Sequence, residues 1–66
     1  MPKFAVLFRD DLAIGVTRVE AANAAAAEAL VLEQHEGGSV KALVDQQVTV
    51  ENRHRVLARW VQTLDA

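Results

Sequence analysis

The sequence predicts a small α+β domain in which a three-stranded, mainly antiparallel sheet carries two helices, in the order β-β-α-β-α. Two apolar segments of strand length flank an acidic turn near the N-terminus. An alanine-rich segment follows and ends at Gly37-Gly38, and the last part of the chain repeats apolar residues at helical spacing. With 66 residues, 52% of them apolar, the chain is predicted to form one compact domain over residues 1–66.

The first two elements are predicted to be strands. Residues 3–9 are apolar on both faces, which is typical of a strand in the middle of a sheet. Asp10-Asp11 is a polar turn, and in residues 12–20 Leu12, Ile14 and Val16 alternate with smaller or more polar residues. The two segments are therefore expected to form an antiparallel hairpin.

A helix is predicted over residues 24–36. Asn23 precedes it and is a favourable N-cap, because its side-chain oxygen can accept a backbone N–H of the first turn. Gly37-Gly38 follows it, and we expect a glycine in the left-handed conformation to end the helix there. The small alanine side chains would let this helix lie close to the sheet.

Residues 39–45 fit two structures. As a strand they place Val40, Ala42 and Val44 on one face, and as a helix they would be capped by Ser39. The strand is favoured because valine-rich runs suit sheets and because a strand commonly follows a helix that ends in glycine. Residues 46–50 are expected to form a loop or a short extension of the strand.

The last element is predicted to be a helix over residues 51–64. Leu57, Trp60, Val61 and Leu64 recur at helical spacing and define one apolar face. On that face, Trp60 is expected to belong to the core rather than to an interface.

The expected strand order in space is 2-1-3, with the most apolar strand in the centre and the third strand antiparallel to it. Both helices are expected to pack on one face of this sheet if the other face is free. The other face would then expose either Leu7 and Leu43 or Phe4 and Phe8. An apolar face of that kind is a candidate interface and would allow a homodimer.

No constellation in the sequence points to catalysis or to a metal. Ser39 is the only serine, and it lacks the Gly-x-Ser-x-Gly surroundings of a hydrolase nucleophile. His35 and His54 lie on different predicted helices, there is no cysteine, and Gly37-Gly38 lacks the Lys-Ser/Thr of a phosphate-binding loop. The sequence therefore predicts a protein that is not an enzyme and that uses no metal or cofactor.

The charges divide unevenly along the chain. Residues 1–51 hold eight of the nine acidic residues and four of the seven basic ones, whereas residues 52–66 hold three arginines and Asp65. An acidic surface of this kind could dock on a basic partner protein, such as a bacterial nucleic-acid-binding complex. Its candidate residues are Asp10, Asp11, Glu20, Glu28, Glu33 and Glu36.

The alternative is a nucleic-acid-binding or regulatory protein that contacts phosphates through Arg53, Arg55 and Arg59. Three arginines are few for that purpose and the net charge of the chain is −2, so nucleic acid is the less favoured partner. The longest apolar runs are far shorter than the roughly 20 residues of a membrane span, and a cytoplasmic location in a bacterial host cell is expected.

The combination of an acidic body (Asp10, Asp11, Glu20, Glu28, Glu33 and Glu36) with no catalytic spacing resembles small inhibitors encoded by phages and mobile elements, including anti-CRISPR proteins. That resemblance covers the whole chain and rests on its overall profile. It implies a non-catalytic module that works by covering a surface of a partner protein.

Overall fold

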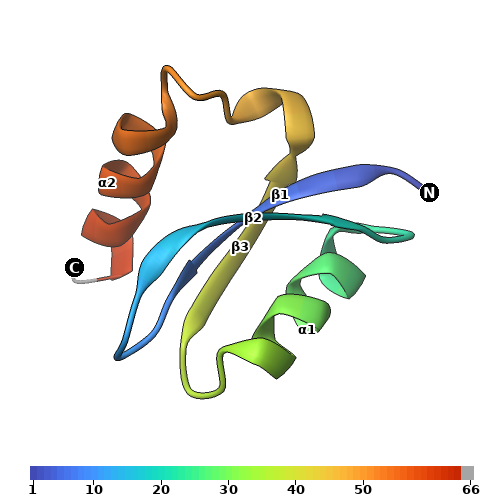
Figure 1. The fold of residues 1–66 in the computed structure, drawn as a ribbon, viewed down its shortest axis with the longest axis horizontal. Coiled ribbons are helices and arrows are strands. Elements are labelled where there is room, and N and C mark those ends of the chain that lie inside the picture. Colours follow the sequence, from blue (N-terminus) through green and yellow to red (C-terminus); the bar gives the residue numbers. More distant parts are fainter. Residues whose placement is uncertain (65–66) are drawn as a thin grey trace.

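The computed structural model describes residues 1–64, and Asp65 lies outside the described residues. Its elements are β1 (Lys3–Arg9), β2 (Ile14–Glu20), α1 (Ala24–Gln34), β3 (Ser39–Val44), a 3-10 turn η1 (Asp45–Gln47) and α2 (Arg53–Leu64). The element order β-β-α-β-α and the strand at residues 39–44 confirm the sequence prediction. The sheet is antiparallel and its order is β2-β1-β3, as expected (Figure 1).

The β1–β2 turn is longer than the sequence indicated. Asp10 accepts the backbone N–H groups of Leu12 and Ala13 at 2.8 Å each, so these residues belong to the turn and β2 begins only at Ile14. Leu12, predicted to be in the strand, is 95% exposed. An aspartate that accepts N–H groups two and three residues ahead is a common way to stabilise a turn.

Helix α1 begins at the predicted residue and ends two residues earlier than predicted. Asn23 Oδ1 accepts the N–H of Ala26 at 2.8 Å, and Gly37 has a φ of +78°. The helix ends at Gln34 rather than at residue 36, because His35 already leaves the helical conformation. Val31 and Ala27 face the sheet and are fully buried.

The two helices lie on opposite faces of the sheet, and the expectation that they share one face is wrong (Figure 1). Helix α1 packs with Val6, Phe4 and Phe8, whereas α2 packs with Ala5 and Leu7. The cause is physical: β1 is apolar on both faces, so a single covered face would leave the other in water.

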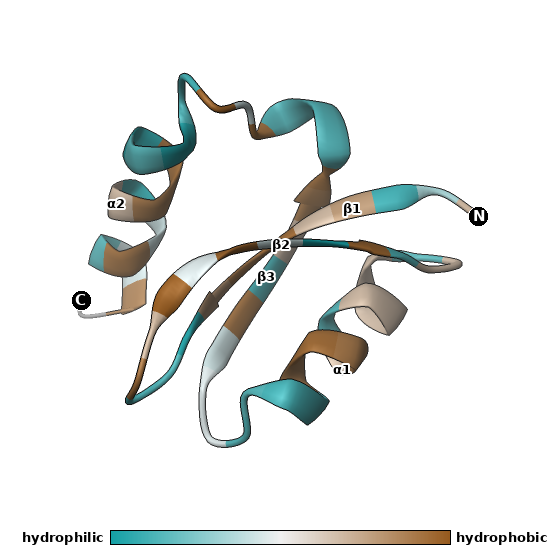
Figure 2. Cartoon of the chain, in the orientation of Figure 1, coloured by the Kyte–Doolittle hydropathy of each residue, from teal (hydrophilic) through white to brown (hydrophobic). Residues whose placement is uncertain are grey.

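The segment after β3 carries the chain to the second face. The hydrophilic turn η1 follows β3 directly, and Figure 2 shows its polar character. Val48 then inserts into the core beside Leu7 and Trp60. Arg18 of β2 holds this segment, because its Nη2 donates to the carbonyl oxygen of Val48 at 2.7 Å and its Nε lies 2.9 Å from Asp45 Oδ1.

Helix α2 therefore covers the face of the sheet that we expected to be exposed. Neither of the two alternative pairs expected to be exposed forms a bare face. Leu7 is 1% exposed and Leu43 is partly buried against the same cluster, while Phe4 and Phe8 pack in the cluster of α1. Trp60 is 8% exposed and belongs to the core, as predicted. The helix begins at Arg53 rather than at residue 51, because Asn52 Oδ1 accepts the N–H of Thr49 and closes a turn before it.

Candidate functional site

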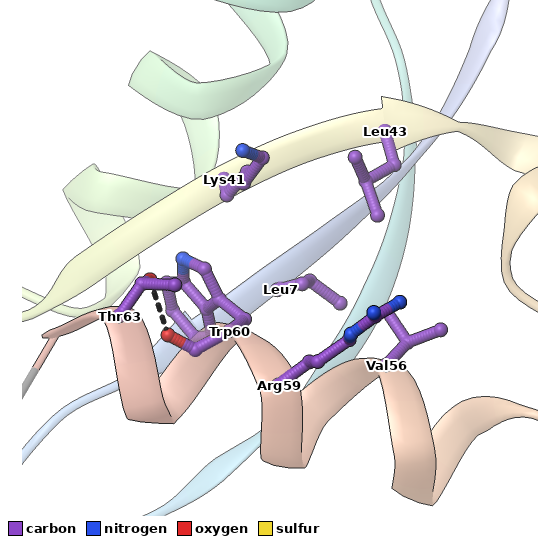
Figure 3. A pocket seen from close by; sticks show the side chains of 7 residues that line it. All are labelled: Leu7, Lys41, Leu43, Val56, Arg59, Trp60 and Thr63. Carbon is purple, nitrogen blue, oxygen red and sulfur yellow. Dashed lines mark hydrogen bonds between the residues drawn. The ribbon is translucent and has the colours of Figure 1, made fainter.

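Helix α2 does not cover its face of the sheet completely, and an open groove of about 340 Å³ runs between it and β3 (Figure 3). Leu7 of β1 and Leu43 of β3 come from the sheet side. From α2, the lining residues are Val56, Arg59, Trp60 and Thr63, and Lys41 of β3 completes the set. We call this the α2–β3 groove.

The α2 side of the groove follows from helical geometry. Residues 56, 59, 60 and 63 are spaced i, i+3, i+4 and i+7, so they form one row along the helix. On the sheet side, Lys41 and Leu43 are two residues apart in β3 and therefore point to the same face. The register places them opposite Leu7 and Ala5 of β1, respectively.

The polar groups that line the α2–β3 groove are mostly donors. Lys41 and Arg59 are exposed cations, and neither has a carboxylate within 4.0 Å in the described part of the chain. The indole nitrogen of Trp60 points toward β3 (Figure 3) and donates to no acceptor among residues 1–64. The hydroxyl of Thr63 donates to the carbonyl oxygen of Trp60 at 2.6 Å.

The lining combines carbon surface with a few polar groups. It contains no carboxylate, imidazole or thiol, and its polar side chains are those of Lys41, Arg59, Trp60 and Thr63. What it offers is an apolar floor, two positive charges and one indole N–H. Elsewhere within residues 1–64, no three His, Cys, Asp or Glu side chains gather closely enough to hold a metal ion.

The six predicted acidic residues do not form one continuous surface. Asp10, Asp11 and Glu36 line a shared hollow where the β1–β2 turn meets the end of α1. Glu33 is exposed on α1. Glu20 lies at the far end of β2, opposite Lys3.

Two of these six carboxylates are engaged in bonds inside the molecule. Glu28 accepts the N–H of Ala42 at 2.9 Å. Asp10 lies 2.5 Å from Nδ1 of His35, whose ring stacks on Phe8 with centroids 4.1 Å apart. The hydrogen bond with His35 lowers the pKa of the Asp10 carboxyl, and the N–H groups of Leu12 and Ala13 lower it further.

The three predicted arginines do not share one side of α2: Arg55 and Arg59 are four residues apart and are neighbours on the helix surface, whereas Arg53 lies on another side. Arg59 lines the α2–β3 groove, whereas Arg53 lines two hollows on the β2 side of the helix. Arg55 is exposed and lines none of these hollows. The fold thus brings Arg59 together with Lys41, which was not among the site residues predicted from the sequence.

The signal that could have found the groove is the row of residues 56, 59, 60 and 63 on α2, which mixes apolar and cationic residues. That β3 lies opposite this row could not be predicted, because the side of the sheet that α2 covers depends on the irregular segment between β3 and α2.

Neither helix within residues 1–64 has the length and apolar character needed to cross a membrane. Comparison with known proteins gave no match: no family model, no curated protein and no solved structure is significantly similar to this chain.

Proposed function

We propose that this chain is a non-catalytic binding module that holds an acidic, apolar peptide segment of a partner protein in the α2–β3 groove. The observation that carries the proposal is the pairing of an apolar floor with Lys41, Arg59 and the Trp60 indole N–H, none of which has an acceptor or a carboxylate within the described residues.

The apolar part of the groove favours an aliphatic or aromatic side chain as its occupant. Leu7, Leu43 and Trp60 offer carbon surface, and removing such surface from water is worth about 25 cal/mol per Å². The volume of about 340 Å³ is at the small end for ligand sites. An open groove of this size suits one or two side chains of an extended peptide better than a whole cofactor.

The charged part of the groove favours carboxylates beside that side chain. Lys41 and Arg59 are both exposed, so each ion pair with a ligand would contribute only about 0.2–1 kcal/mol. Their larger effect is on selectivity, because a basic segment would be repelled. We therefore expect weak binding that requires both an apolar residue and an acidic neighbour.

This proposal keeps the non-catalytic binding role that the sequence suggests, but it moves the binding surface from the acidic residues to the α2–β3 groove. A phage- or mobile-element-encoded inhibitor of the anti-CRISPR type, acting in the cytoplasm of a bacterial host, would fit a module that occupies a partner's docking segment. Docking through the acidic residues remains a separate prediction. Phosphate binding by the arginines is less favoured, because Arg53 and Arg59 lie on different sides of α2.

The test uses random peptides displayed on phage and selected against the immobilised full chain. Selected peptides are then titrated in solution, with the fluorescence of Trp60, the only tryptophan, as the reporter. We expect enrichment of a leucine or phenylalanine flanked by Asp or Glu. The double variant Lys41→Glu, Arg59→Glu should weaken binding at least about ten-fold, because both cations become repulsive.

The matched control is Glu33→Lys, Glu36→Lys, which reverses two exposed charges outside the groove. It should leave binding of the selected peptides unchanged. If the selection enriches basic peptides, or if only the Glu33/Glu36 variant loses binding, the groove is not the site and the acidic surface is the better candidate.

A further inference from the structure

The two edge strands of the sheet, β3 and β2, differ in whether their outward N–H groups have acceptors. On β3, the outward N–H of Ala42 donates to Glu28 Oε2 at 2.9 Å, and the outward N–H of Val44 donates to Gln47 Oε1 at 3.1 Å. Both acceptors are side chains of this chain, one from α1 and one from η1. Two of the three outward N–H groups of β3 are therefore occupied by side chains of this chain, and such cover disfavours strand pairing; the third, that of Val40, has no acceptor within residues 1–64.

The edge of β2 has no such protection. The β1–β2 ladder continues at both ends, where Asp10 N–H donates to Ala13 at 2.9 Å and Ala21 N–H donates to Pro2 at 3.1 Å. These bonds show that odd-numbered residues of β2 bond to β1. The N–H groups of Val16, Arg18 and Glu20 thus point away from the sheet, and none has an acceptor within residues 1–64.

We propose that two copies of this chain pair through β2, antiparallel, and join their sheets into one of six strands. If the two-fold axis passes by Thr17, all residues of Ile14–Glu20 pair with the same strand of the second copy. In that register Val16 lies opposite Arg18 of the second copy, and Ile14 lies opposite its Glu20. All outward N–H and C=O groups along β2 then find partners, because both strands present the same even-numbered residues.

Charge complementarity favours a second copy as the occupant. Ile14 is 49% exposed and lines a hollow between β2 and α2 together with Arg53 and His54. Glu20 of the second copy would arrive on this same face, beside Arg53, and the two-fold axis repeats the contact. Glu20 lies opposite Lys3 of β1 but has no cation within 4.0 Å in the described single chain, so the pairing would give its carboxylate a further cation, Arg53.

No like charges are brought face to face in this register. Arg18, which lies nearest the axis among the charged residues, is turned across the sheet toward Asp45 and Val48. The α2–β3 groove lies on the other side of α2 from β2, so the inference does not rest on the proposed function.

The test is sedimentation equilibrium of the full chain over a concentration series, combined with residue-resolved amide hydrogen exchange by NMR. We expect a monomer–dimer equilibrium in which protection of the Val16, Arg18 and Glu20 N–H groups rises with the dimer fraction. Protection of Ala42 and Val44 should not change with concentration. A chain that remains monomeric at millimolar concentration, or a dimer in which the β2 amides exchange freely, overturns the inference.

Charge exchange makes the test specific to the register. Glu20→Arg should raise the dimer dissociation constant at least about ten-fold, because two contacts are reversed at once. Arg53→Glu should do the same, and the double variant Glu20→Arg, Arg53→Glu should recover most of the loss. The matched control Glu33→Arg changes the same charge on α1 and should have no effect. A double variant as weak as its parents contradicts the register.

Discussion

At the scale of residues, the Asp10 side chain makes three hydrogen bonds that connect two parts of the fold. It accepts two backbone N–H groups in the β1–β2 turn and pairs with His35 at the end of α1. One side chain thereby ties the hairpin to the helix. The sequence identified the turn, but it gave Asp10 and Asp11 the same solvated role, since nothing in a pair of adjacent aspartates says which one faces the helix.

The lowered pKa of Asp10 predicts a dependence of stability on pH. A carboxyl whose pKa is lower in the folded state contributes stability at pH values above its unfolded pKa, and that contribution is lost as the pH falls through the folded value. We therefore expect the thermal midpoint to drop as the pH falls below about 4. Asp10→Asn should flatten this part of the profile and lower the midpoint at neutral pH.

Asp11→Asn is the matched control, because Asp11 is exposed and adjacent in sequence. It should reproduce the profile of the unmodified chain when both are followed by circular dichroism from pH 2.5 to 7. Equal profiles for Asp10→Asn and the unmodified chain would show that the His35 contact contributes no pH-dependent stability.

At the scale of elements, local signals predicted what local interactions fix. Local patterns predicted the two strands of the hairpin and favoured a strand over a helix at residues 39–45. Asn23 predicted the start of α1, and Gly37-Gly38 predicted its end to within two residues. The side of the sheet that each helix covers was not predictable in this way. It depends on residues 45–52, where η1 and the Asn52 turn redirect the chain by side-chain hydrogen bonds that leave no periodic pattern.

The α1–β3 connection yields a prediction about its two glycines. A Cβ on Gly38 would lie 2.4 Å from the carbonyl oxygen of Arg9, whereas a Cβ on Gly37 would meet no atom within 4 Å. Gly38→Ala should therefore force the backbone apart and cost about 1–3 kcal/mol of unfolding free energy. Gly37→Ala should lower the unfolding free energy by only about 1 kcal/mol, the cost of placing alanine in the left-handed conformation.

Urea unfolding of both variants measures the difference, with Gly37→Asn as a further control. Asparagine tolerates the left-handed conformation better than alanine, so its cost should be the smallest of the three. A Gly38→Ala variant as stable as Gly37→Ala would mean that β1 and β3 can separate locally without loss.

At the scale of the whole molecule, one strand explains the architecture. β1 is apolar on both faces, so the chain places one helix on each, with α1 over Val6 and α2 over Leu7. The sequence revealed the two apolar faces and the strand order, yet the α2–β3 groove could not be predicted. Its lining comes from β1, β3 and α2, and these meet only after the chain has crossed to the second face.

The unequal edges of the sheet limit how far association can proceed. Pairing through β2 uses the open edge of each copy and leaves two β3 edges outside, where Glu28 and Gln47 occupy the N–H groups of Ala42 and Val44. We therefore expect growth to stop at two molecules. If the double variant Glu28→Ala, Gln47→Ala opened the outer edges, each pair could recruit the next, and light scattering should then report filaments or precipitate that the unmodified chain does not form.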